Sequence, residues 1–142
     1  MSTEEQIQQY INSPPEPKRM DMQALHGLIL KILPAVKLWF LDEKGKTVSN
    51  PNIGYGSHHI QYADGTSKEF YNIGLSANST GISLYVFGIG DKTYLAQTFG
   101  KNVGKATVTG YCIKFIKLND INLDILEAAI RYGVAHASTT NH

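Results

Sequence analysis

The order in which helical and strand-like hydrophobic patterns follow one another leaves few folds open to this chain. Apolar residues recur at helical spacing up to Leu33, at strand-like spacing in the middle, and at helical spacing again from Leu123. Strands that follow one another without intervening helices pair through hairpins, which excludes a doubly wound parallel sheet. The pattern predicts one α+β domain over residues 1–142, with an antiparallel sheet of about five strands and the N- and C-terminal helices packed on one face.

Local signals mark the ends of the expected helices. Ser2 and Glu5 have the spacing of a capping box, which predicts a short opening helix, and the prolines within 13–15 end it. A second helix is expected over about residues 17–33, ended by the proline that follows. The last helix is expected to begin after Asn122, because an asparagine side chain accepts hydrogen bonds from the free N–H groups of a first helical turn.

Short strand-like patterns fill the middle of the chain. Asp64-Gly65 lies between two of them and is a strong hairpin signal, and residues 78–81 are expected to form a further turn. A short helix is expected over 93–99, and the turn-rich segment 42–51 is expected to be a loop. The segments expected to form strands are 36–41, 57–62, 70–75, 82–87 and 111–118.

Composition argues against several classes of function. The formal net charge is +1 with 18% charged residues, so we expect neither nucleic-acid binding through phosphate contacts nor binding to a membrane surface. The one cysteine, Cys112, excludes an intramolecular disulfide and a cysteine-rich zinc site. No segment reaches the roughly 20 apolar residues of a membrane span, and the polar first residues do not resemble a secretion signal, so the expected compartment is the cytoplasm.

Several segments together resemble a known family. Residues 54–65 read Gly-Tyr-Gly-Ser-His-His-Ile-Gln-Tyr-Ala-Asp-Gly, residues 74–76 read Gly-Leu-Ser, and residues 118–124 read Leu-Asn-Asp-Ile-Asn-Leu-Asp. With these segments the chain resembles the YdhG-like family, domain of unknown function 1801, over nearly its whole length. The family has no agreed activity. The resemblance implies terminal helices on an antiparallel sheet, as in frataxin, and an iron-chaperone function, because some members are frataxin-like and carry that label.

The histidines and carboxylates of the sequence have spacings more typical of structural roles than of metal binding. His58 and His59 are adjacent in an expected strand, so their side chains point to opposite faces and cannot share one metal ion. The acidic residues of the first two expected helices are interleaved with lysine and arginine, which is typical of a solvated surface rather than an iron-binding ridge. These acidic residues are Glu4, Glu5, Glu16 and Asp21. We therefore expect no metal and no cofactor, and a frataxin-like iron chaperone is the alternative function.

Catalytic patterns are incomplete. Residues 100–105 resemble a phosphate loop but are one residue too short, and Ala106 stands where a serine or threonine would bind magnesium. Cys112 has apolar neighbours, an environment typical of inert packing cysteines. No Gly-x-Ser-x-Gly pattern occurs. Enzymatic activity stays open, and a non-enzymatic role is favoured.

Strand alternation predicts a sheet face that carries aromatic side chains. If Leu38 and Leu84 point toward the helices, the opposite face carries Trp39, His59, Phe70, Asn72 and Tyr85. A sheet face open to water is mostly polar, so we expect this one to be covered by the loop 42–51, to form a homodimer interface, or to bind a small ligand. The leading function is a binding or accessory domain of unknown ligand, with these five residues as candidate ligand contacts.

Overall fold

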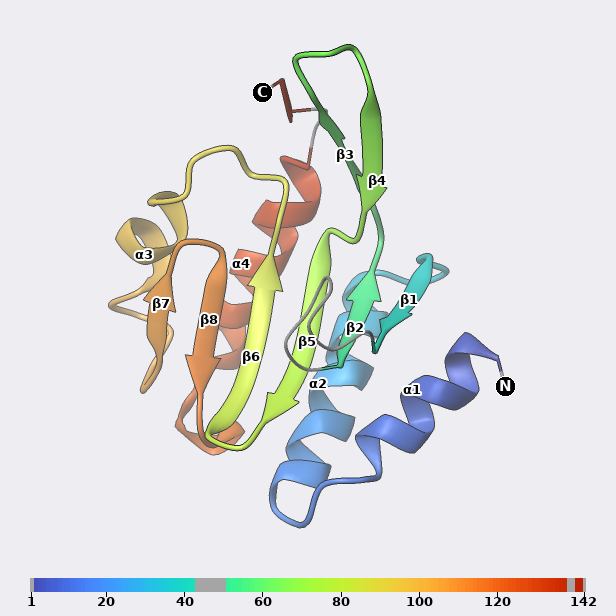
Figure 1. The fold of residues 1–142 in the computed structure, drawn as a ribbon. Coiled ribbons are helices and arrows are strands. Elements are labelled where there is room, and N and C mark those ends of the chain that lie inside the picture. Colours follow the sequence, from blue (N-terminus) through green and yellow to red (C-terminus); the bar gives the residue numbers. More distant parts are fainter. Residues whose placement is uncertain (1, 43–50, 138–139, 142) are drawn as a thin grey trace.

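The computed structural model describes residues 2–42, 51–137 and 140–141, with helices around a central sheet (Figure 1). In that part of the chain the helices are α1 (Thr3–Ile11), α2 (Lys18–Ile32), α3 (Tyr94–Phe99) and α4 (Leu123–Ala135), and η1 (Leu118–Asp120) is a single 3-10 turn. The strands are β1 (Leu38–Leu41), β2 (Asn52–Tyr55), β3 (His58–Gln61), β4 (Ser67–Phe70), β5 (Ile73–Asn78), β6 (Gly81–Val86), β7 (Thr107–Thr109), β8 (Cys112–Phe115) and β9 (Thr140–Asn141).

The main sheet has six strands in the order β1-β2-β5-β6-β8-β7, and every neighbouring pair is antiparallel. The predicted α+β fold, an antiparallel sheet packed with N- and C-terminal helices, is confirmed, with six strands in place of about five. The sequence pattern does not predict β2 or β7. β2 is four residues long and contains a glycine, and β7 has only three residues. Both are strands because longer neighbours pair with them, not because of their own propensity.

A smaller sheet, in the order β4-β3-β9, stands apart from the main one and extends above it in Figure 1. It contains the expected strand 57–62. The prediction of a single sheet of about five strands is wrong for this segment. Gly56, whose φ of +72° favours glycine, turns the chain out of the main sheet directly after β2. The hairpin predicted at Asp64-Gly65 is confirmed, because β3 and β4 pair antiparallel on either side of it.

The expected strand 70–75 is two strands with a crossing between them. β4 ends at Phe70 in the small sheet, and β5 begins at Ile73 in the main sheet. Tyr71 and Asn72 belong to neither strand. Because these two residues change the direction of the chain, the alternation of side chains does not continue from Phe70 into β5.

Two helices bury one face of the main sheet. In Figure 1, α2 and α4 lie behind the sheet, and each contacts β5 and β6. The α1 helix packs beside β1 and buries Ile7 and Ile11, each 1% exposed. The core between α2, α4 and the sheet consists of side chains with no exposed surface, among them Met22, Leu25, Ile29, Ile73, Leu75, Leu84, Val86, Ile113, Leu126 and Ile130. Burial of this apolar surface is the main stabilising contribution to the fold.

Side-chain caps begin two of the helices as predicted. Ser2 and Glu5 form a capping box at the start of α1, and the Asn122 side chain accepts hydrogen bonds from the N–H groups of Asp124 and Ile125 at the start of α4. These bonds satisfy N–H groups that have no partner within the helix.

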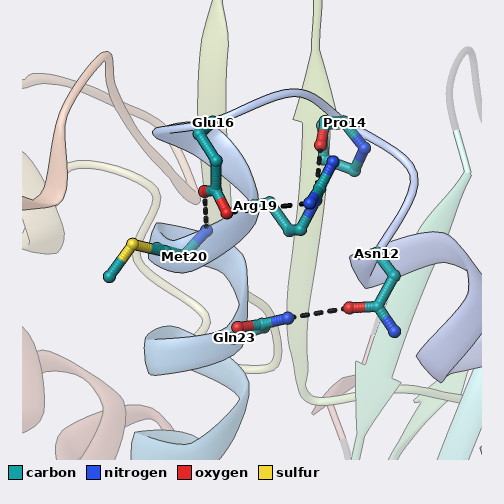
Figure 2. Close-up of polar contacts among 6 residues, drawn as sticks. All are labelled: Asn12, Pro14, Glu16, Arg19, Met20 and Gln23. Carbon is teal, nitrogen blue, oxygen red and sulfur yellow. Dashed lines mark hydrogen bonds and ion pairs between the residues drawn. The ribbon is translucent and has the colours of Figure 1, made fainter.

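Polar contacts also close the turn between α1 and α2 (Figure 2). Glu16 Oε1 accepts a hydrogen bond from the N–H of Met20 at 3.0 Å, at the start of α2. There the free N–H groups and the positive end of the helix dipole favour a carboxylate. Gln23 Nε2 donates to Asn12 Oδ1 at 2.7 Å and joins the two helices directly.

Candidate ligand-binding site

The face of the main sheet turned away from α2 and α4 carries a row of residues, one from each of five neighbouring strands, that are partners in register. Across β1, β2, β5, β6 and β8 the row consists of Trp39, Gly54, Gly74, Tyr85 and Cys112. The two glycines leave a gap that the ring of Tyr71 fills. A Cβ added to Gly54 would lie 2.6 Å from Tyr71 Cβ, and one added to Gly74 would lie 2.5 Å from Tyr71 Cε2. Both positions therefore require glycine for the ring to lie flat on the sheet.

Six aromatic side chains form a continuous cluster there, which we call the aromatic face: Trp39, Phe70, Tyr71, Tyr85, Phe87 and Tyr111. Ring centroids are 4.2 Å apart for Phe70 and Tyr71, and 5.6 Å apart for the stacked pair Tyr85 and Phe87. Trp39 lies 6.3 Å from Phe70. Tyr71 is 2% exposed, whereas the other five rings are half-buried. The cluster has a buried centre and an accessible rim.

The indole ring of Trp39 is held in place by contacts to its edge and to its face. Its Nε1–H donates to the carbonyl oxygen of Gly56 at 2.8 Å. Lys37 Nζ lies 4.3 Å from the ring centroid, within the range of a cation–π interaction. Lys37 also pairs with Glu69 at 2.9 Å, which lowers the pKa of that carboxyl group. The indole is thus preorganised at one end of the aromatic face.

A pocket of about 280 Å³ opens beside the aromatic face, where the β3–β4 hairpin meets the segment that follows β6. We call it the His58 pocket; it is lined by His58, Ile60, Phe70, Phe87, Gly88, Gly90 and Tyr111. Its volume is just below the range of about 300–1,000 Å³ that is usual for ligand pockets. Gly88, with a φ of +92°, lies against the His58 imidazole, since a Cβ at Gly88 would be 3.1 Å from His58 Cγ. The glycine allows the loop to close over the ring.

His58 supplies the polar group of this pocket. Its side chain is 7% exposed, and its Nδ1 is buried without a hydrogen-bond partner in the part of the chain that the structure describes. Burial lowers the pKa of the imidazole, and a hydrogen bond between the imidazole and the Tyr71 backbone raises it to a smaller extent. The other polar group in the lining, the Tyr111 hydroxyl, donates to the carbonyl oxygen of Gly90 at 3.4 Å. A neutral imidazole that can donate or accept one hydrogen bond therefore faces apolar and aromatic neighbours.

The structure brings together three of the five residues predicted to share one sheet face. Trp39, Phe70 and Tyr85 belong to the aromatic face. His59 does not: it is exposed on β3 of the small sheet, opposite Glu69. Asn72 does not either. It is 4% exposed, and its Nδ2 donates to the carbonyl oxygens of Phe87 at 2.6 Å and of Gly133 on α4 at 3.4 Å.

These two corrections share one physical cause. The prediction applied a single alternation to strands that the chain interrupts at Gly56 and again at Tyr71-Asn72, and each interruption resets which face a side chain occupies. The same interruptions hid His58 and Tyr71. The prediction also missed Phe87, although alternation along the expected strand 82–87 places it on the same face as Tyr85, and it missed Tyr111, which directly precedes β8. The paired glycines of β2 and β5 are the sequence signal for Tyr71, but they reveal it only once their register is known. The loop 42–51 was one of the elements expected to cover this face, and its residues 43–50 lie outside the described part of the chain.

Three of the four carboxylates considered for an iron-binding ridge have structural partners. Glu5 Oε1 accepts from the N–H of Ser2 at 3.1 Å, and Glu16 caps α2. Asp21 Oδ2 accepts from the N–H of Leu118 at 3.1 Å and joins α2 to η1. Within the described ranges, no three residues of the types His, Cys, Asp and Glu form a group that could hold a metal ion.

The single thiol is in an environment that disfavours reactivity. Cys112 is half-buried in β8, and burial raises the pKa of its thiol. A raised pKa keeps the thiol protonated near neutral pH, whereas nucleophilic cysteines are thiolates. Cys112 therefore has a packing role on the outer face of the main sheet.

Comparisons of this chain with protein-family models, with curated proteins and with solved structures found no match. None of the helices in residues 2–42, 51–137 and 140–141 has the length and apolar character needed to cross a membrane.

Two buried histidines make the stability of the fold depend on pH. Burial lowers the pKa of His58 and of His26, whose Nδ1 lies 2.6 Å from the Tyr55 hydroxyl. A lowered pKa in the folded state means that the unfolded chain binds these protons more readily, so acidification favours unfolding. We expect the stability from this effect to be present above about pH 6.5 and to decline as the pH falls below that value.

Urea unfolding between pH 7.5 and 5 measures this dependence. We expect the midpoint to fall over that interval, and His58→Phe to flatten the slope because it removes one titrating group. A wild-type midpoint that stays constant from pH 7.5 to 5 would contradict the assignment.

Proposed function

We propose that this chain is a binding or accessory domain that holds a small, planar, mostly apolar molecule in the His58 pocket. The observation that supports the proposal most directly is that His58, whose Nδ1 has no hydrogen-bond partner among the described residues, lines a pocket with mostly apolar and aromatic walls. A buried polar group without a hydrogen bond costs about 1–3 kcal/mol, and a ligand that bonds to it removes that cost.

The lining supports a particular shape and chemistry of ligand. Phe70, Phe87 and Tyr111 present rings, which stack on flat partners. The volume of about 280 Å³ suits a molecule with one ring or two fused rings. Because burial lowers the pKa of His58, its imidazole is neutral at neutral pH and suits an uncharged hydroxyl or N–H group. Phenols and indoles combine these features.

Titration of the ¹⁵N-labelled protein with indole, and separately with phenol, tests the proposal by NMR. We expect saturable shifts of backbone resonances at Phe70, Phe87 and Tyr111. His58→Phe keeps an aromatic ring but removes the hydrogen bond, so we expect it to weaken binding by about tenfold. Tyr62→Ala is the control, because Tyr62 is 45% exposed and does not line the pocket. Shifts elsewhere, or no saturation at millimolar indole or phenol, would refute the proposal.

The YdhG-like resemblance and a cytoplasmic location remain parts of this proposal. The resemblance also suggests iron carriage as an alternative. No specific observation favours it, because three of the four acidic residues considered for iron binding, Glu5, Glu16 and Asp21, are engaged in helix capping or in joining elements. A binding role at the aromatic face is therefore the function that the geometry supports best.

A further inference from the structure

A second cavity, of about 640 Å³, lies away from the aromatic face at the end of β8. Its walls come from the turn between β5 and β6, the start of β7, the end of β8 and η1. We call it the lysine pocket; it is lined by Thr80, Lys105, Ala106, Thr107, Lys114, Phe115, Ile116, Lys117 and Asp120. Its volume is within the range of about 300–1,000 Å³ that is usual for ligand pockets.

Backbone contacts join the walls of the lysine pocket to one another. The N–H of Lys105 donates to the carbonyl oxygen of Asp120 at 3.1 Å, and Gly104 forms a β-bridge with Ile121. Gly104 has a φ of +111°, and a Cβ there would collide with the same Asp120 carbonyl oxygen, so this close approach requires glycine. Thr107 and Lys114 are direct partners in the β7–β8 ladder. These contacts therefore hold the backbone of the segments that carry the lysines in place.

The charges of the lysine pocket are unbalanced. The lining residues include three lysines, Lys105, Lys114 and Lys117, and one acidic residue, Asp120, which gives a local charge of +2. All three lysines are exposed, and the ion pairs among the described residues involve Arg19, Lys37 and Arg131 instead. The whole chain has a formal charge of only +1, so this concentration of positive charge is a local feature.

We propose that the lysine pocket binds a small molecule that carries a phosphate group on an apolar body. A phosphate monoester has a charge of about −1.5 to −2 at pH 7, which balances the local excess. Lysine binds phosphate as a point charge, whereas planar carboxylates favour the paired donors of arginine, and no arginine lines the pocket. Ile116, 67% exposed at the rim, provides apolar contact for the organic part of the ligand.

Calorimetric and NMR titrations with monobutyl phosphate test this inference, with pentanoate as a carboxylate of similar length. At low salt we expect saturable one-to-one binding of monobutyl phosphate, with amide shifts at residues 105–107 and 114–117. We expect the double variant Lys114→Gln, Lys117→Gln to weaken binding at least tenfold. Added salt should also weaken it, because exposed charges are screened.

The matched control is the double variant Lys31→Gln, Lys92→Gln, which removes the same charge from two exposed lysines outside the lysine pocket. An equal loss of affinity in this control would overturn the inference in favour of non-specific attraction. Equal binding of pentanoate would overturn the choice of phosphate, and shifts at Phe70 or Phe87 would place the probe in the His58 pocket instead. Because the probes and variants differ from those for indole, either proposal can fail without the other.

Discussion

Replacing Tyr71 with alanine is expected to lower the free energy of unfolding by about 3–5 kcal/mol, as for other large aromatic residues removed from a core. The Tyr71 ring is 2% exposed, rests on Gly54 and Gly74, and lies between the rings of Phe70 and Phe87. Glycines have no side chains that could relax into the space, so the cavity would persist. The cost of such truncations rises with the residual cavity.

Tyr71→Phe separates packing from hydrogen bonding. It keeps the ring and removes only the hydroxyl, which donates to Asn52 Oδ1 at 3.3 Å. We expect a loss of about 1 kcal/mol for this variant, since a typical hydrogen bond makes a modest net contribution. Urea unfolding of both variants provides the measurement. A Tyr71→Ala protein within about 1 kcal/mol of the wild type would show that the aromatic face does not depend on this ring.

Gly133→Ala is expected to destabilise the domain by about 1–3 kcal/mol, although alanine is the better helix former. Gly133 is on the side of α4 that faces β6, and a Cβ there would collide with Val86 Cγ1. The added methyl group must push α4 away from the sheet or displace Val86, which has no exposed surface. The steric cost therefore exceeds the gain in helix propensity.

Gly27→Ala is the matched control for Gly133→Ala. Gly27 is in α2, is exposed, and has nothing within 4 Å of an added Cβ. We expect this variant to stabilise the domain by about 0.5–1 kcal/mol through helix propensity alone. In a cycle with Val86→Ala, the two changes at the α4 contact should cost less together than the sum of the single changes. Two alanine variants that stabilise equally would disprove the close helix–sheet contact.

Part of the candidate site could be predicted from strand alternation. Trp39 and Tyr85 are in strands of the main sheet, so counting residues within each strand places them on its outer face. Phe70 is at the end of β4, beside that face, and belongs to the cluster through its contacts with Trp39 and Tyr71. The burial of His58 could not be predicted, because it depends on a loop glycine, Gly88, that is distant in sequence.

The sequence by itself determined the terminal helices, the β3–β4 hairpin and the class of fold. Caps such as Asn122, the Asp64-Gly65 hairpin and the helical stripes act over a few residues, so their effect can be read locally. The tertiary structure alone decided which strands share a sheet, since β2 and β7 are short and form by pairing with their neighbours. It also decided the contents of both pockets. These depend on contacts between segments far apart in the chain, and no local propensity specifies such contacts.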